Sequence, residues 1–331
     1  MKMKSVTATD LEFSAVGFGC WAAGGSAIWT GTDDANSIQA IRRAIELGIT
    51  FFDVAPVYGF GHAETILGQA LRGQRQNVVI ATKCGLSWDA GGTITNDLKP
   101  ATIEREIDDS LRRLNTDYVD IYQIHWPDPA TPIAMTMETL NKLKSAGKIR
   151  HIGVSNFSVA LMDETRQYGE IVSHQGLYNL LERNPIQYHN IPLEYRTEDE
   201  ILPYCRRHGL AFFPYSPLFQ GLLTDQFRVQ NQFDAHDVRS ANPKLNGKLF
   251  ETYYQIRAEL LAFAAKIGKP LSQVAINWLI HQEAVTSVIC GAQTVAHVEE
   301  NAASASWDFT PEMAAAIERI LQPYHDPVYT A

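Results

Sequence analysis

Residues 49–59 place two proton-exchanging groups beside a buried segment. The apolar run at 49–52 predicts a buried strand that ends in the carboxylate of Asp53. Pro56 and Gly59 predict a turn that carries Tyr58, because proline fixes φ and glycine tolerates positive φ. A carboxylate and a phenol at one strand end are typical of a functional loop on a rigid scaffold. Taken alone, Asp53 fits the capping of a turn equally well.

Lys83 and His125 extend this pair to a set suited to general acid catalysis. A free tyrosine has a pKa of about 10, and the ammonium of Lys83 is expected to stabilise the tyrosinate and lower that pKa. Asp53 would hold Lys83 charged, and His125 would orient a substrate carbonyl. Lys83 directly follows the apolar run 77–82, an uncommon place for a lysine, which favours function. His125 alone also fits a core histidine, although the adjoining Trp126 predicts a pocket wall.

The elements that would position these side chains alternate between strand and helix. After most of the strand-length apolar runs, apolar residues spaced three and four apart predict a helix, as at Ile38, Ile41 and Ile45. Eight such units predict a closed (β/α)8 TIM barrel in one domain spanning 1–331, rather than a doubly wound sheet. The expected strands lie at 15–19, 49–53, 77–82, 118–124, 149–154, 171–175, 210–215 and 285–290.

Two further segments fall outside this repeat. Alternating residues at 6–13, broken at Thr9 and Asp10, predict a β-hairpin that plugs the amino-terminal end of the barrel. The polar stretch 216–248 after the seventh strand exceeds the usual loop length, which indicates a functional or mobile segment.

Polar side chains follow six of the expected strands directly. In a barrel these strand ends form one face, where barrel enzymes hold their sites. Turn chemistry does not require reactive or amide groups at so many strand ends, so the pattern favours an active site. The six residues are Asp53, Lys83, His125, Asn156, Gln175 and Tyr215.

The composition fits a large globular enzyme that is cytoplasmic. The chain has 331 residues, of which 45% are hydrophobic and 20% charged, with a net charge of −9. The acidic balance gives no footprint for nucleic acid or anionic membrane. No apolar run approaches the roughly 18 residues of a membrane span, and no signal peptide is visible at the amino terminus. We expect a small-molecule substrate and a monomer.

At this level of detail the chain resembles the aldo-keto reductase superfamily, in the bacterial branch of general-stress and inositol-cluster reductases. The matching motifs run in family order from the first strand to the last, so the resemblance covers nearly the whole chain. They are Gly17-Phe18-Gly19, FFDVAPVYGFGHAE (51–64), ATKCGL (81–86), YQIHWPDP (122–129), GKIRHIGVSNF (147–157), Tyr178-Asn179, PYSPL (214–218), GLLT (221–224) and GAQTVAHVEEN (291–301).

The resemblance implies an NAD(P)H-dependent oxidoreductase that reduces an aldehyde, ketone or sugar carbonyl, or runs in reverse. Tyr58 would be the general acid, tuned by Lys83 and Asp53, and His125 would orient the carbonyl. The implied cofactor-binding residues are Gly19, Cys20, Trp21, Ser155, Asn156 and Gln175 near the nicotinamide; Tyr215 stacked on its ring; Ser216, Pro217, Leu218, Gly221 and Leu222 along the pyrophosphate; and Gly291, Gln293, His297, Glu300 and Asn301 at the adenosine end.

The adenosine end departs from the family pattern. Gln293, His297 and Asp225 stand where relatives often place partners for the adenosine 2′-phosphate. Arg228 or Arg239 would replace them, since arginine binds phosphate in a bidentate manner. NADPH is therefore the first cofactor choice, with NADH as the alternative.

Aromatic and thiol side chains also gather near the strand ends. Trp21, Trp88 and Trp126 are expected to wall the substrate pocket, whereas Trp29 and Phe219 fit a pocket wall or ordinary barrel packing equally. The charge of Lys83 would lower the pKa of the adjoining Cys84. The alternative is that Cys20, Cys84 and Cys290 are inert small hydrophobes.

Other functions fit parts of the pattern. A barrel aldolase would use Lys83 as its Schiff-base former, a sugar or polyol dehydrogenase would run the reaction oxidatively, and a non-enzymatic subunit would only hold the cofactor. Residues 17–22 fit G-x-G-x-x-A, but the loop-like residues that follow open no helix, so a Rossmann site is rejected. The histidines include no HExxH motif and no cluster with cysteine, so no metal site is expected.

Overall fold

Eight parallel strands form the central sheet of the protein. The computed structural model describes residues 1–25, 33–228, 233 and 238–324. The strands neighbour one another in the order β13-β10-β9-β8-β5-β4-β3-β14, with every pairing parallel. They are β3 (Val16–Gly19), β4 (Phe51–Asp53), β5 (Val79–Cys84), β8 (Val119–Ile124), β9 (Ile149–Ser155), β10 (Ser173–Leu177), β13 (Ala211–Tyr215) and β14 (Val288–Gly291).

The sheet closes between its first and last strands. Phe212 of β13 forms a parallel bridge with Val285, which precedes β14. The amide of Thr286 donates to the Phe212 carbonyl at 2.9 Å, and the Phe212 amide donates to Thr286 Oγ1 at 3.2 Å. These contacts complete the (β/α)8 barrel that the sequence predicts.

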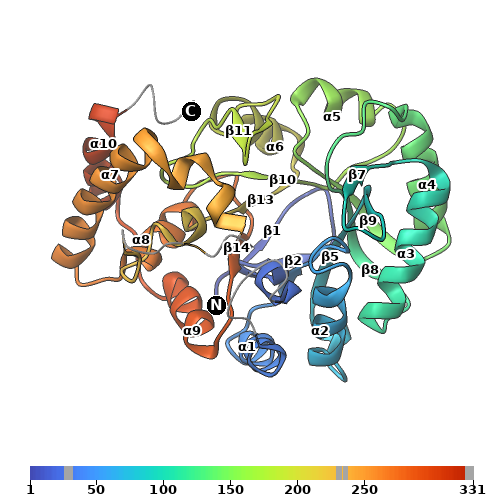
Figure 1. Ribbon diagram of the computed structural model, residues 1–331, viewed down its shortest axis with the longest axis horizontal. Helices are drawn as coiled ribbons and strands as arrows, with labels where there is room; N and C mark the ends of the chain where they lie inside the picture. Colours follow the sequence, from blue (N-terminus) through green and yellow to red (C-terminus); the bar gives the residue numbers. More distant parts are fainter. Residues whose placement is uncertain (26–32, 229–232, 234–237, 325–331) are drawn as a thin grey trace.

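Helices surround the strands on the outside (Figure 1). Helix α3, for example, buries one apolar stripe with Ile103, Ile107 and Leu114. Asp33 caps the first helix by accepting from the Asn36 amide at 2.9 Å. The helices are α1 (Asp34–Glu46), α2 (His62–Ala70), α3 (Pro100–Leu114), α4 (Ile133–Ser145), α5 (Val159–Thr165), α6 (Leu202–His208), α7 (Gly247–Lys266), α8 (Leu271–Ile280), α9 (Val295–Ala303) and α10 (Pro311–Leu321).

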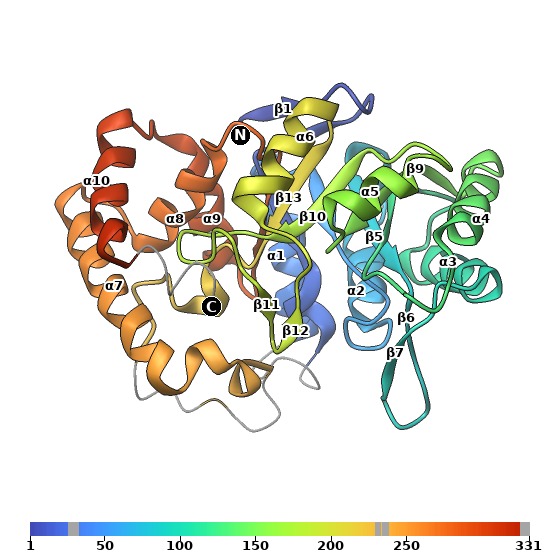
Figure 2. The same cartoon turned by 90° about the horizontal axis from the view of Figure 1, so that it is seen from above.

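The amino-terminal hairpin lies at one end of the barrel (Figure 2). At the other end lie two hairpins, formed by β6 (Leu86–Trp88) with β7 (Ile94–Asn96) and by β11 (Gln187–Tyr188) with β12 (Ile191–Pro192). The strands of the amino-terminal hairpin are β1 (Met3–Ser5) and β2 (Glu12–Ser14), so the expected strands at 6–13 were placed too far inward and those residues mostly form the connection. Phe13 enters the barrel, where its ring centroid lies 5.4 Å from that of Phe51 and 5.2 Å from that of Phe213. The hairpin therefore closes this end with an aromatic plug.

Several expected boundaries are wrong by a few residues. Strand pairing extends β5 and β10 beyond the expected ends, so Lys83 and Gln175 lie inside their strands, while Asp53 and Tyr215 are the last residues of theirs. Only His125 and Asn156 follow their strands directly. Ladder ends depend on the register of neighbouring strands, which a single sequence does not display.

Other elements were not predicted at all. Two hairpins cross the carboxyl-terminal side of the barrel: β6 (Leu86–Trp88) with β7 (Ile94–Asn96), and β11 (Gln187–Tyr188) with β12 (Ile191–Pro192). The described residues between β13 and α7 contain three short 3-10 turns, η4 (Phe219–Gly221), η5 (Val238–Ala241) and η6 (Pro243–Leu245). In the described part of the chain, no helix combines the length and apolar character needed to cross a membrane.

Candidate active site

Asp53 and Lys83 form an ion pair inside the carboxyl-terminal end of the barrel. The Lys83 Nζ donates to Asp53 Oδ2 at 2.9 Å, and the two side chains are 0% and 4% exposed, respectively. A buried charge is costly unless it is paired and hydrogen-bonded. The carboxylate at the end of β4 therefore makes the lysine in β5 tolerable.

Lys83 also holds the hydroxyl of Tyr58. Its Nζ lies 3.1 Å from the Val54 carbonyl and 3.1 Å from Tyr58 Oη. An ammonium has three hydrogens to donate and cannot accept, so Asp53, Val54 and Tyr58 use all three. The Tyr58 oxygen is consequently the acceptor, and its own hydrogen remains to be donated to another partner.

The turn that carries Tyr58 depends on Gly59. This residue has a φ of +65°, and a Cβ there would lie 2.0 Å from the carbonyl oxygen of Gly24. Only glycine accepts both the backbone conformation and the close approach. The turn is thereby pressed against η1 (Cys20–Gly24), the 3-10 turn that follows β3. No α-helix opens at residues 20–24, which agrees with the rejection of a Rossmann site.

Burial sets the protonation states of this group. It raises the pKa of Tyr58 well above its ordinary value, and the charge of Asp53 adds to the rise. The expected net lowering of this pKa is therefore wrong, because burial outweighs the stabilisation of the tyrosinate by Lys83. Burial lowers the pKa of His125 well below its usual range, and the Lys83 charge lowers it further. At neutral pH the site thus holds a protonated tyrosine and an uncharged imidazole.

Two glutamines complete the surroundings of Asp53. Gln175 Nε2 donates to Asp53 Oδ1 at 2.7 Å, and Gln123 Nε2 lies 3.4 Å from the same oxygen. One of the two amide hydrogens of Gln175, which was expected to contact the nicotinamide, is directed at the ion pair. Gln123 was not predicted as a site residue. It pairs with Lys83 in the β5–β8 register and lies two residues before His125, on the same face of the chain.

Asn156 forms a second polar centre beside the first. It has a φ of +61°, and its Nδ2 donates to the His125 carbonyl at 3.2 Å. Its Oδ1 accepts from the hydroxyls of Tyr195 at 3.0 Å and Tyr215 at 2.9 Å. Asn156 therefore ties Tyr215 and the His125 backbone together. Tyr195 was missed because it lies between recognisable elements.

Aromatic rings line the same end of the barrel. The ring centroid of Tyr58 lies 6.3 Å from that of Trp21 and 5.9 Å from that of His125, which it meets edge-on. Trp126 is partly buried against the core. Trp88 stands on β6, its ring 5.4 Å from that of Phe60, at the outer rim.

Phe219 and Trp29 both fitted either a pocket wall or barrel packing in the sequence, and the structure decides only for Phe219. Phe219 is 1% exposed, and its ring lies 4.8 Å from that of Tyr253, so its role is packing against α7. Trp29 lies outside the described residues.

The turn after β13 has an unusual backbone. Ser216, Phe219 and Gln220 have φ values of +54°, +48° and +52°, and Gly221 has +101°. Non-glycine residues adopt this region at an energetic cost, which is characteristic of functional sites. A Cβ on Gly221 would meet no described atom within 4 Å, so the turn presents open backbone there. Pro217, Leu218 and Leu222 belong to the same turn.

The residues expected at the adenosine end gather where β14 leads into α9. Thr294 caps this helix by accepting from the His297 amide at 3.3 Å. Asn301 Nδ2 donates to the Gly291 carbonyl at 3.2 Å, and Glu300 accepts from the Ser272 hydroxyl. The buried Nε2 of Gln293 has no hydrogen-bond partner among the described residues. An unpaired buried donor at a helix start fits a site for a ligand with acceptor atoms, such as a dinucleotide.

The two arginines proposed as phosphate partners lie on the long segment itself. Arg228 is exposed, and its Nη1 donates to the carbonyls of Asp225 at 2.7 Å and Phe227 at 3.0 Å. The Arg239 guanidinium lies 4.5 Å from the centre of the Phe233 ring. Asp225 accepts from the Leu271 amide at the start of α8 at 3.2 Å.

The cysteines near the strand ends are buried thiols. Burial raises the pKa of Cys84 well above its ordinary value, and Glu106 contributes to the rise. The expectation that Lys83 lowers this pKa is wrong, because Cys84 points away from the Lys83 side of β5. Cys20, Cys205 and Cys290 are also free and buried.

Comparisons with known proteins point in one direction. A model of the Aldo/keto reductase family matches residues 15–322, which confirms the resemblance noted from the motifs. The Bacillus subtilis aldo-keto reductase YhdN is 36% identical over 332 residues, covering 99% of this chain and 96% of the relative. The Escherichia coli NADH-specific methylglyoxal reductase is 34% identical over 345 residues, covering 96% of this chain and 100% of the relative.

A solved structure agrees over the whole chain. The glycerol dehydrogenase AKR11B4 from Gluconobacter oxydans superposes with a TM-score of 0.86. The two chains are 36% identical, and the match covers 99% of each. The two proteins therefore have a common barrel fold.

Proposed function

The chain belongs to the aldo/keto reductase family and is thus an oxidoreductase of carbonyl compounds, and we propose that Tyr58 is its proton donor. One observation carries this proposal: Lys83 Nζ, paired with Asp53 inside the barrel, lies 3.1 Å from Tyr58 Oη. The lysine occupies a lone pair of the phenol oxygen and leaves the hydroxyl hydrogen for a substrate. The substrate class is a small aldehyde, ketone or sugar.

The four residues divide the work of the proton transfer. Tyr58 donates its proton to the carbonyl oxygen as negative charge develops there. Lys83 stabilises the charge left on the phenol oxygen, and an interaction of this kind is worth about 4 kcal/mol at an intermediate dielectric. Asp53 holds Lys83 protonated and in position. His125, uncharged at neutral pH, orients the carbonyl. The nicotinamide cofactor, when bound, supplies the hydride.

The remaining polar groups would hold the cofactor along one side of the barrel mouth. Asn156 and Gln175 would contact the nicotinamide amide, and Tyr215 would stack on the ring. Backbone groups of Ser216–Leu222 would line the pyrophosphate, because this turn exposes its main chain. Gln293 and its neighbours at the start of α9 would contact the adenosine, where a buried donor awaits an acceptor.

NADPH remains the first choice of cofactor and NADH the alternative. The E. coli relative is NADH-specific by name. In this chain, Arg228 donates to carbonyls of its own loop, and the Gln293 side chain carries no charge. A 2′-phosphate would therefore need Arg228 or Arg239 to reorient. Direct comparison of the two cofactors decides between them.

Oxidation of a polyol is a second candidate direction. The solved structure with the 0.86 TM-score is called a glycerol dehydrogenase, and the same four groups serve both directions of the reaction. A Schiff-base aldolase fits less well, because all three hydrogens of Lys83 are engaged and its side chain is 0% exposed. We further propose that the chain acts as a cytoplasmic monomer with a single catalytic domain.

Cofactor binding followed by tryptophan fluorescence quenching tests this function. Tighter binding of NADPH than of NADH would assign the 2′-phosphate to loop arginines, with Arg228→Ala and Arg239→Ala expected to abolish the difference. Equal or tighter NADH binding would assign a relaxed adenosine site and favour the oxidative direction. Binding of neither cofactor would overturn the reductase proposal. Borohydride trapping with a carbonyl substrate would then test Lys83 as a nucleophile.

A further inference from the structure

A buried ion pair lies beside the turn after β13, away from Asp53 and Lys83. Lys244 Nζ donates to Glu182 Oε1 at 2.8 Å and lies 3.3 Å from the Gln187 carbonyl. The Lys244 and Glu182 side chains are only 4% and 7% exposed. Lysine and glutamate are rarely buried unless they are paired, so this position demands an explanation. The proposed chemistry uses neither residue.

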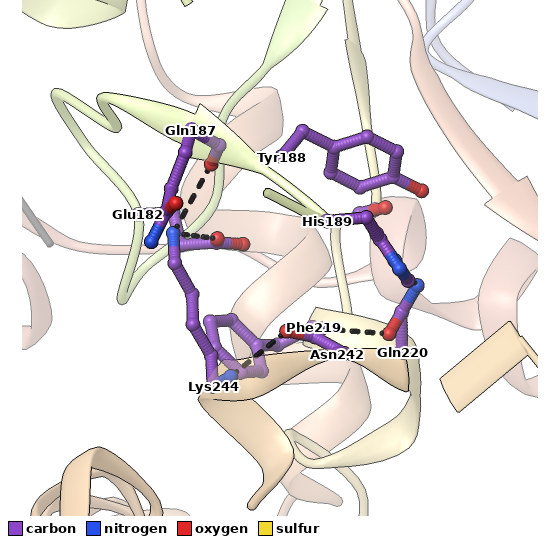
Figure 3. Close-up of a pocket in the computed structure, with 9 residues that line it drawn as sticks. Glu182, Gln187, Tyr188, His189, Phe219, Gln220, Asn242 and Lys244 are labelled. Carbon is purple, nitrogen blue, oxygen red and sulfur yellow. Dashed lines mark hydrogen bonds and ion pairs between the residues drawn. The ribbon is translucent and has the colours of Figure 1, made fainter. Parts of the chain in front are cut away.

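The pair belongs to a wider polar cluster that we name the clasp (Figure 3). It joins three chain segments: the loop after β10, the β11–β12 hairpin and the segment between β13 and α7. Its cavity has a volume of about 10 Å³, which is the space of a single water. The clasp is therefore filled by its own side chains and is not a ligand pocket. Its members are Asn179, Glu182, His189, Gln220, Asn242 and Lys244.

Asn179 connects the clasp to Ser216, the first residue of the turn. This buried amide donates to Glu182 Oε2 at 2.8 Å and to the Ser216 carbonyl at 3.1 Å. Ser216 has positive φ and directly follows Tyr215, whose ring is expected against the nicotinamide. The position of Glu182, set by Lys244, thus determines where Asn179 holds the start of the turn.

Gln220 connects the clasp to the other end of the turn. Asn242 Nδ2 donates to Gln220 Oε1 at 2.9 Å, and Gln220 Nε2 lies 2.6 Å from His189 Nε2. Asn242 Oδ1 also accepts from the Lys244 amide at 2.9 Å. Gln220 again has positive φ. The Gln220 end of the turn is therefore fixed by Asn242 and His189, and it is connected to Lys244 through the Lys244 backbone amide.

The same contacts position an aromatic residue at the mouth. Lys244 Nζ holds the carbonyl of Gln187, and the next residue, Tyr188, presents its ring 5.3 Å from that of Tyr215 in an edge-on arrangement. The hairpin that carries Tyr188 has few backbone contacts of its own, with two paired residues in each strand. Lys244 therefore places Tyr188 as well as the turn.

We propose that Lys244 and Glu182 are positioning residues that hold the Ser216–Gly221 turn in its cofactor-binding conformation. This inference rests on the proposed function, because the turn is assigned there to the pyrophosphate. The pair touches no reacting atom and acts through Asn179 and Gln187. Its loss is expected to weaken cofactor binding and leave the chemical step intact.

The test compares a double variant with a matched control. Lys244→Met alone leaves Glu182 buried and unpaired and is expected to fold poorly, so Lys244→Met/Glu182→Met removes both charges together. Arg75→Met is the control at the opposite end of the barrel, because it removes a 2.8 Å ion pair with the buried Asp120 and leaves Asp120 paired with Arg150 at 3.1 Å. Both proteins lose an ion pair to a buried carboxylate, and only the double variant loses the contacts that hold Asn179 and Gln187.

The double variant is expected to bind NADPH and NADH about tenfold more weakly, with kcat at saturating cofactor within about threefold of wild type. Amide hydrogen exchange at 216–222 is expected to accelerate in the cofactor-free protein. Arg75→Met should change neither measurement. A folded double variant with unchanged affinity and unchanged exchange would overturn the inference, as would equal effects in the control. Wild-type protein that binds neither cofactor would instead overturn the proposed function, and the exchange measurement would still judge the clasp.

Discussion

The interior of the barrel contains an apolar layer and, two residues further along the same strands, a polar one. In the apolar layer the rings of Phe51 and Phe213 stack with centroids 4.4 Å apart, and Phe13 of the hairpin closes the end. In the polar layer, the residue that follows Phe51 on the same face of β4 is Asp53, and the residue that follows Phe213 on the same face of β13 is Tyr215. The same alternation relates Ala81 to Lys83 and Ile121 to Gln123. Side chains two residues apart share a face of a strand, so both layers point inward.

The two layers obey different rules of stability. An apolar layer needs only volume and shape, and neighbouring rings substitute for one another at moderate cost. A polar layer needs a partner for every group, because an unpaired buried charge or donor is expensive. Asp53 accordingly accepts from Lys83, Gln175 and Gln123 at once. The plug stabilises the fold, and the layer beyond it is arranged for chemistry.

Replacing Tyr58 by phenylalanine should have the largest effect, because it should impair catalysis by the polar layer without lowering the stability of the fold. The change removes the proposed proton donor and leaves the ring, so kcat should fall by about 10²–10⁴-fold. Cofactor affinity and the melting temperature should stay near wild type. Steady-state kinetics and thermal unfolding measure both. Tyr204→Phe on α6 removes a hydroxyl bonded to Asp163, away from the site, and serves as the control. Retention of more than a tenth of wild-type kcat in Tyr58→Phe would contradict the assignment.

Replacing Phe13 by alanine should have the opposite signature. Deleting a buried aromatic ring typically costs about 3–5 kcal/mol of stability, and Phe13 is 0% exposed. The free energy of unfolding should fall by that amount in urea, while kcat measured well below the melting temperature should not change. A large loss of kcat in the folded variant would mean that the two layers are coupled and that the plug also shapes the site.

The sequence predicted the polar layer better than the protonation of its members. The motif spacing brought Asp53, Lys83 and His125 to one face of a barrel, because strand order and direction follow from the alternation of elements. The sign of the Tyr58 pKa shift was wrong, since proximity to a lysine was counted and burial was not. Burial depends on how the turn closes against Gly24, and no local pattern displays that contact.

Residues that act through long-range contacts were also invisible. Tyr195 and Lys244 lie in segments without regular periodicity, and their partners, Asn156 and Glu182, are 39 and 62 positions away along the chain. Both hairpins at the mouth are short, and the β11–β12 hairpin turns through His189 and Asn190, which have positive φ although neither is glycine. The clasp and the hydrogen bond from Tyr195 to Asn156 are therefore visible only in the structure, whereas the groups at the strand ends could be predicted from the sequence.

The pH dependence of the two reaction directions should follow the raised pKa of Tyr58. Reduction needs the protonated phenol, which persists through neutral pH, so kcat/KM for reduction should be flat from pH 6 to 8. Oxidation needs the deprotonated form, whose fraction rises about tenfold per pH unit below the pKa. Its kcat/KM should therefore climb with pH over the same range. His125 has a lowered pKa and should add no step near 6.5. A reduction rate that falls steeply above pH 7 would show that Tyr58 titrates there.

Alkylation of the cysteines should have the smallest effect, although two of them stand close to the polar layer. Burial and the charge of Asp53 raise the pKa of Cys20, and burial raises that of Cys84. A thiol reacts as its thiolate and only where reagent can enter, so native protein treated with iodoacetamide at neutral pH should keep its activity. Mass spectrometry after denaturation should then find unmodified thiols that react readily once unfolded. Rapid inactivation with a single modified cysteine would show that a reactive thiol lies in the polar layer. The cysteines could then no longer be separated, as packing residues, from the polar groups that carry out the chemistry.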